Sequence, residues 1–195
     1  MTCSSSYDDH WGLCADADKQ KGEDMEKSKP EIVFQVGMIV KDVDKVLENL
    51  KDYFEIEEDS IVVKSTKEKA KQGIITENKY NGKPAEFYIK TARLNFGGID
   101  FEYIQPLCQD GGDPYSDWLL EHGQGIHHIN MKLENRKVLD DRMAQEGVVA
   151  HIWSKTGDVE LETYDFREKF GFISEVGDMV VGPMAKVYYS DKENK

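Results

Sequence analysis

Two stretches of the chain repeat the same order of apolar and polar positions. Residues 32–40 are rich in Val and Ile, which is typical of a buried strand, and Asp42 is placed to cap a helix over residues 43–54. The apolar positions of that helix fall on one stripe. The second stretch predicts a strand over residues 126–133 and a helix over 136–146, with Gly147 as its C-cap. The repetition indicates a duplicated unit.

Shorter strands complete each half of the chain. In the first half, the pair Asn81-Gly82 signals a hairpin that leads into a strand over Ala85–Leu94, and Ile99–Ile104 forms the next strand. In the strand over Ala85–Leu94, alternation puts five residues on one face: Glu86, Tyr88, Lys90, Ala92 and Leu94. A helical piece, Tyr115–His122, joins the halves, and the second half continues with strands near 148–153, 159–164 and 171–176.

These elements predict an α+β protein. Two paired βαβββ units, residues 30–106 and 126–177, form one cup-shaped mixed sheet in a domain that spans residues 30–177. The C-terminal extension, residues 178–195, is apolar in places, and we expect it to add an edge strand or to pack on a second subunit. An open cup with edges to cover predicts a homodimer.

Four ligand-type side chains stand at matching points of the two halves. Gln35 and His128 lie in the opening strands, and Glu102 and Glu175 each follow a glycine by four residues in the closing strands. A duplicated fold would bring them together near a pseudo-twofold axis, where one imidazole and three oxygens suit a divalent cation such as zinc, cobalt, nickel or manganese. The alternative for each carboxylate is a solvent-facing position, and for His128 a place in the core.

Composition narrows the class of function. The net charge of −13 argues against nucleic acid and anionic membranes as partners, because both need a basic face. Residues 1–29 lack an apolar segment of the signal-peptide kind and predict a disordered tail. The wide spacing of Cys3, Cys14 and Cys108 fits no zinc or disulfide pattern, so we expect a reducing, cytoplasmic location.

Three segments together resemble the vicinal oxygen chelate superfamily, which includes glyoxalase I and methylmalonyl-CoA epimerase. Residues 123–129 resemble the epimerase segment Gly-x-Gly-x-His-His-Ile, residues 98–107 the Glu-Leu-Leu-x-Pro-Leu segment, and residues 37–44 the opening strand. The resemblance covers about residues 32–177 and implies the metal ligands Gln35, Glu102, His128 and Glu175. The first of these is usually His in the epimerases, whereas the set Gln, Glu, His, Glu is that of zinc-type glyoxalase I.

The resemblance also implies an activity. Epimerases use a second Glu as a base, which maps onto Glu86, so that Glu86 and Glu175 would serve opposite faces of a carbon next to a carbonyl. We therefore expect a metal-dependent racemase or epimerase that acts on a small-molecule carbonyl substrate, either an acyl-CoA or a neutral ketone such as an isoflavanone. The alternatives are a lactoylglutathione lyase of the glyoxalase I type and a metal-free binding protein of the same fold.

Overall fold

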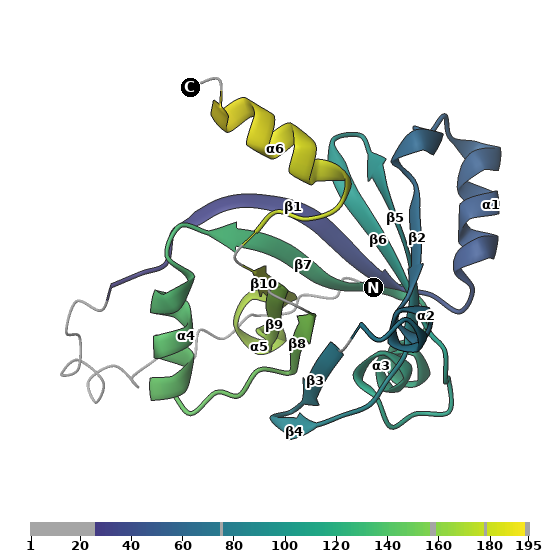
Figure 1. The fold of residues 1–195 in the computed structure, drawn as a ribbon. Coiled ribbons are helices and arrows are strands. Elements are labelled where there is room, and N and C mark those ends of the chain that lie inside the picture. The colour runs from purple at the N-terminus through teal and green to yellow at the C-terminus, as the bar shows by residue number, and fades with distance from the viewer. Residues whose placement is uncertain (1–25, 75, 157–158, 178, 194–195) are drawn as a thin grey trace, which may run out of the picture.

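The computed structural model describes residues 26–74, 76–156, 159–177 and 179–193, so that most of the tail predicted over residues 1–29 lies outside it. The described residues form one mixed sheet of ten strands, with helices packed against it (Figure 1). The strand order is β2-β5-β6-β1-β7-β10-β9-β8-β3-β4. None of the described helices combines the length and the apolar character that are needed to cross a membrane.

The first half of the chain contains the elements of one predicted repeat and an insertion. The repeat consists of β1 (Pro30–Ile39), α1 (Val43–Tyr53), β2 (Val62–Ser65), β5 (Ile89–Phe96) and β6 (Ile99–Pro106). A short 3₁₀ turn, η1 (Glu58–Ser60), precedes β2. The insertion between β2 and β5 holds α2 (Thr66–Lys71), β3 (Thr76–Tyr80) and β4 (Lys83–Pro84).

The second half repeats the pattern after the connecting helix α3 (Pro114–His122). It consists of β7 (Gly125–Leu133), α4 (Arg136–Gln145), β8 (Ile152–Thr156), β9 (Val159–Asp165) and β10 (Ile173–Gly177), with the one-turn helix α5 (Arg167–Phe170) before β10. The C-terminal helix α6 (Pro183–Glu193) follows. The predicted fold class, two paired βαβββ units in one mixed sheet, is confirmed.

The strand register shows the pseudo-twofold relation between the repeats. The first strand of each repeat pairs in parallel with the last, β1 with β6 and β7 with β10, and the antiparallel pair β1–β7 joins the repeats. Val36 lies opposite Ile129 at the centre of that pair. Gln35 and His128 each precede this central pair by one residue on their own strand, so that they occupy equivalent positions.

The two repeats bury their outer faces under their own helices. Val43 of α1 packs with Ala92, Leu94 and Tyr103 of the first repeat, and Met143 of α4 packs with Leu133, Tyr164 and Val176 of the second. The side chain of Asp42 accepts a hydrogen bond from the Lys45 amide at 3.0 Å, which confirms the predicted cap of α1. With both outer faces covered, the inner face of the sheet is left to form the cup.

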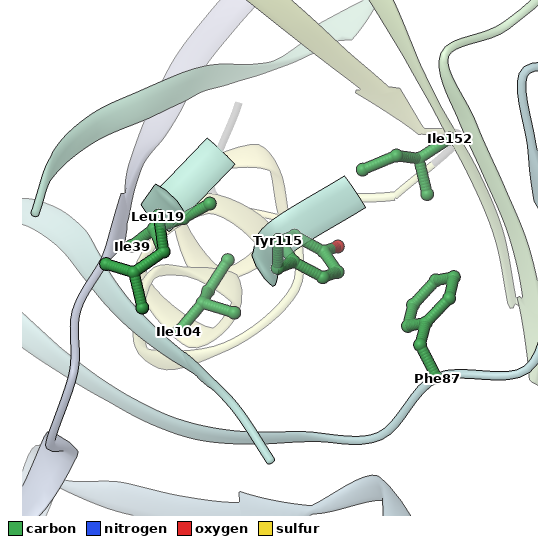
Figure 2. Close-up of a cluster of buried hydrophobic side chains, with 6 residues drawn as sticks. All are labelled: Ile39, Phe87, Ile104, Tyr115, Leu119 and Ile152. Atoms are coloured by element: carbon green, nitrogen blue, oxygen red, sulfur yellow. The ribbon is translucent and has the colours of Figure 1, made fainter. Parts of the chain in front are cut away.

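One end of the cup is filled by an apolar cluster around α3. Tyr115 and Leu119 of α3 form one apolar cluster with Ile39 and Ile104 of the first repeat, Ile152 of the second, and Phe87 (Figure 2). The carboxylate of Asp113 fixes the start of α3 by accepting hydrogen bonds from the amides of Tyr115 and Ser116, at 2.9 and 3.0 Å. The cluster therefore closes the cup around a small polar space.

Two of the sequence predictions about local structure are wrong. The strand predicted over Ala85–Leu94 begins only at Ile89, as β5. For the C-terminal extension, the expected edge strand is wrong, because the segment forms helix α6, whose Met184 packs with Phe34 of the same chain; the other expectation, packing on a second subunit, stays a prediction. The spacing of Met184 and Tyr188, four residues apart, was a helical signal. The predicted hairpin at Asn81-Gly82 is confirmed, since both residues have positive φ between β3 and β4.

Candidate active site

Three of the four predicted ligands line one cavity inside the cup. Gln35 of β1, Glu102 of β6 and Glu175 of β10 face a space of about 210 Å³. His128 of β7 joins them, because its Nε2 lies 3.3 Å from Glu175 Oε2. The register explains the arrangement, since Glu102 lies opposite Gly37 and Glu175 opposite Asn130, which are equivalent positions of the two repeats. The structure thus brings together all four residues that the repeat comparison singled out.

The imidazole of His128 occupies a space that Gly37 leaves free. Gly37 is the cross-strand partner of His128, and a Cβ atom at position 37 would stand 2.6 Å from Nδ1 of the ring and closer still to Cε1 and Nε2. On its other side, His128 Nδ1 lies 3.0 Å from Nδ1 of His127, which packs against the ring of Trp118. The ring of His128 is therefore held from both sides.

An amide side chain that the sequence analysis missed links the two repeats. Asn130 Nδ2 donates to Gln35 Oε1 at 3.0 Å and also to Glu175 Oε1. Asn130 stands two residues after His128 on the same strand face, and that spacing was the available signal. Through this bridge, the orientation of Gln35 is coupled to that of Glu175.

A buried ion pair lies beside the same residues. Arg93 of β5 donates from Nε to Asp100 Oδ2 at 2.8 Å and from Nη2 to the Val181 carbonyl at 3.0 Å. Gln35 Nε2 donates to the same Asp100 oxygen at 2.8 Å. The side chain of Asp100 has no exposed surface, and that of Arg93 is 14% exposed. Arg93 is also the register partner of Glu102, so a permanent positive charge stands next to the predicted ligands.

Burial sets the protonation states of the site. It raises the pKa of Glu175 to about 7, against the opposing effects of Arg93 and Asn130. It also raises the pKa of Glu102, which Arg93 lowers and Glu175 raises further. Burial lowers the pKa of His128 to about 4, so the imidazole is neutral near pH 7. The Tyr115 hydroxyl, whose pKa burial and both carboxylates raise well above its usual range, stays protonated. The cavity therefore combines a neutral base, a proton donor and two carboxyls that retain protons readily.

The donor set fits a divalent cation in type and in charge. Asp100, Glu102 and Glu175 face one guanidinium, so full ionisation would leave two uncompensated negative charges in a buried space. His128 Nε2 has no hydrogen-bond partner among the described residues. Within the described part of the chain, no three His, Cys, Asp or Glu side chains are grouped in a way that could hold a metal ion. Gln35, which the sequence predicts as a further ligand, lines the same cavity as Glu102 and Glu175.

The structure does not bring Glu86 to this cavity. Glu86 is exposed in the segment before β5, where it accepts a hydrogen bond from the Tyr88 hydroxyl at 2.6 Å. The reason is strand parity: Ile89, Thr91 and Arg93 face the cavity, whereas Ala92 and Leu94, the residues predicted to share a face with Glu86, pack under α1. The second carboxyl in the cavity is that of Glu102.

Comparison with known proteins gave matches among solved structures. No family model matches the chain, and no curated protein matches its sequence. The chain is similar to the methylmalonyl-CoA epimerase of Mycobacterium tuberculosis, with 15% identity and a TM-score of 0.45 over 74% of this chain and 85% of that one.

Two further structures are similar to the same extent. A Streptomyces coelicolor methylmalonyl-CoA epimerase in complex with 2-nitronate-propionyl-CoA is 16% identical, with a TM-score of 0.48 over 76% of this chain and 97% of that one. A hypothetical protein from Bacillus halodurans C-125 is also 16% identical, with a TM-score of 0.47 over 78% and 94%.

Proposed function

We propose that this chain is an isomerase that moves a proton at a carbon α to a carbonyl group, as a racemase or epimerase. One observation carries the proposal: two carboxyl groups, Glu102 and Glu175, reach one cavity from equivalent positions of two repeats. Inversion at a carbon needs a proton acceptor on one side and a proton donor on the other, and a pseudo-twofold pair of carboxyls supplies both. In the metal-free site, burial raises the pKa of Glu175 to about 7, which suits an exchange of protons near neutral pH.

The remaining residues of the cavity have supporting roles in this proposal. Arg93 holds a fixed positive charge where negative charge develops on the substrate oxygen. Asn130 and Asp100 hold Gln35 in place, and Asn130 also orients Glu175. A divalent cation bound by Gln35, Glu102, His128 and Glu175 would polarise the substrate carbonyl.

The alternative is a proton transfer between neighbouring carbons, as in a lyase of the glyoxalase I type. The observation that favours it is the amide at position 35, which is built into the site by hydrogen bonds to Asp100 and Asn130. Both reactions begin with removal of an α-proton, so the same carboxyls would serve either one. The two reactions differ in the carbon to which the proton returns, and an exchange experiment can therefore distinguish them.

The experiment is α-proton exchange in heavy water, followed by NMR across a panel that holds an acyl-CoA thioester, a glutathione hemithioacetal and an isoflavanone. We expect exchange with inversion in one member, and a loss of about 10²- to 10⁴-fold in both Glu102→Gln and Glu175→Gln. Glu86→Gln is the matched control, because Glu86 lies outside the cavity, and it should keep its activity.

Three outcomes would contradict the proposal or part of it. Conversion of the hemithioacetal without racemisation of the other substrates would establish the lyase alternative. Loss of activity in Glu86→Gln with full activity in Glu102→Gln would assign the second carboxyl to Glu86 instead. Tight binding of a panel member without exchange would identify a binding protein.

A further inference from the structure

Two lysines stand at the outer side of the cavity that holds Glu102 and Glu175. Lys64 is exposed on β2 and Lys69 is partly buried on α2, and both line this cavity. They come from the segment that the sequence analysis left without an assigned role. Burial lowers the pKa of Lys69, and the nearby charge of Lys64 lowers it further.

No ion pair links either ammonium group to a carboxylate among the described residues. The net charge of the chain is −13, and other lysines do find a carboxylate, such as Lys90 with Asp44 at 2.5 Å and Lys51 with Glu58 at 2.7 Å. Two like charges that lie near each other repel, and burial removes part of the hydration of Lys69, so the arrangement favours an added negative charge between them. Because Lys64 and Lys69 line the cavity that holds Glu102 and Glu175, the added negative charge would belong to a molecule bound in that cavity.

The rest of the cavity supports one orientation of a bound molecule. The wall formed by the second repeat and the hairpin contributes Ser154, Thr156 and Asn78, which are neutral. The deep end carries Glu102 and Glu175, which repel a second anion. Arg93 also lines the cavity, but it is already paired with Asp100, so the outer side offers the unpaired positive charge for an anionic group. The uncharged part of the same molecule would then point inward.

We propose that Lys64 and Lys69 bind an anionic group of the substrate, a carboxylate or a phosphate, at the outer side of the cavity. That the bound molecule is the substrate rests on the proposed function. The substrate would then be an anion whose charged group lies away from the reacting carbon, which argues against a neutral ketone. Lysine suits this role because it binds carboxylate and phosphate as a point charge.

The first test measures binding without turnover. Calorimetric titration with inorganic pyrophosphate and, separately, with succinate should show binding to the wild-type protein, and the stronger probe identifies the group as phosphate or carboxylate. Lys64→Gln/Lys69→Gln should weaken that binding roughly tenfold. The control is Lys67→Gln, because Lys67 lies on the same helix but lines a different hollow, beside Glu86. Unchanged binding in the double variant, no binding to the wild type, or an equal loss in the control would overturn the proposal.

The second test uses the substrate that the exchange panel identifies. The double variant should raise KM roughly tenfold and leave kcat unchanged, because the lysines lie away from the reacting carbon. A fall in kcat with an unchanged KM would overturn the proposed role. If no member of the panel reacts while the anion titration succeeds, the proposed function fails and the anion site stands, so the two failures are distinguishable.

Discussion

Replacement of Gly37 by Ala tests how His128 is held. The added methyl would stand 2.6 Å from His128 Nδ1 and closer to two other ring atoms, so either the imidazole ring or the strand must shift. The ring is 1% exposed and is held on its far side by His127, which leaves it little freedom to yield. Overpacking of this kind costs about 1–3 kcal/mol, and each kcal/mol lowers the Tm of a chain of this size by about 2–4 °C. We therefore expect Gly37→Ala to melt about 2–12 °C below the wild type.

A double-mutant cycle isolates the contact from other effects of the alanine. In the His128→Ala background the ring is absent, so Gly37→Ala should cost almost nothing, with a coupling energy of about 1–3 kcal/mol between the two positions. Gly125→Ala is the matched control, because Gly125 is also a strand glycine but has no atom within 4 Å of its added Cβ. Thermal unfolding followed by circular dichroism measures all variants. An equal loss with and without the His128 ring would refute the reasoning.

Three further predictions concern the charges of the site. Arg93→Met should cost about 3–5 kcal/mol in urea unfolding, because it leaves the carboxylate of Asp100 buried without its cation. Adding Asp100→Asn should restore part of the loss, and no recovery would contradict the ion-pair argument. In metal-free protein, the raised pKa of Glu175 contributes stability below pH 4.5 that is lost as the pH rises through about 7. Glu175→Gln should therefore gain stability relative to the wild type over that window in urea titrations with EDTA, whereas a constant difference would refute the assignment. Zinc or manganese at about 100 times its Kd should stabilise the protein by about 2.7 kcal/mol, and His128→Ala should abolish most of the resulting rise in Tm. An equal rise in both proteins, with equal metal content by elemental analysis, would exclude His128 as a ligand.

The sequence predicts the repeats and the positions of their polar residues well, because both depend on local periodicity. Alternation alone does not single out Gln35 and His128, because their neighbours Phe34 and His127 are buried as well, but the match between the two repeats places them at equivalent positions. The partners of these residues depend on strand register, which no local pattern specifies. The sequence therefore does not predict Arg93 and Asp100 as part of the site, and it includes Glu86 in a strand that begins only at Ile89, because the start of β5 follows from its pairing with β6.

The hairpin of β3 and β4 has a consequence for how the chain folds. It belongs to the first repeat by sequence, yet β3 pairs along its whole length with β8 of the second repeat, from Thr76 opposite Thr156 to Tyr80 opposite Ile152 (Figure 1). During synthesis, the hairpin of β3 and β4 is complete before β8 has been made. The edge of β3 therefore stays unpaired until the second half is synthesised, and the long sequence separation between β3 and β8 slows folding. The pairing of β3 with β8 thus joins the two halves into one cooperative folding unit. We expect that neither half folds completely when it is expressed alone.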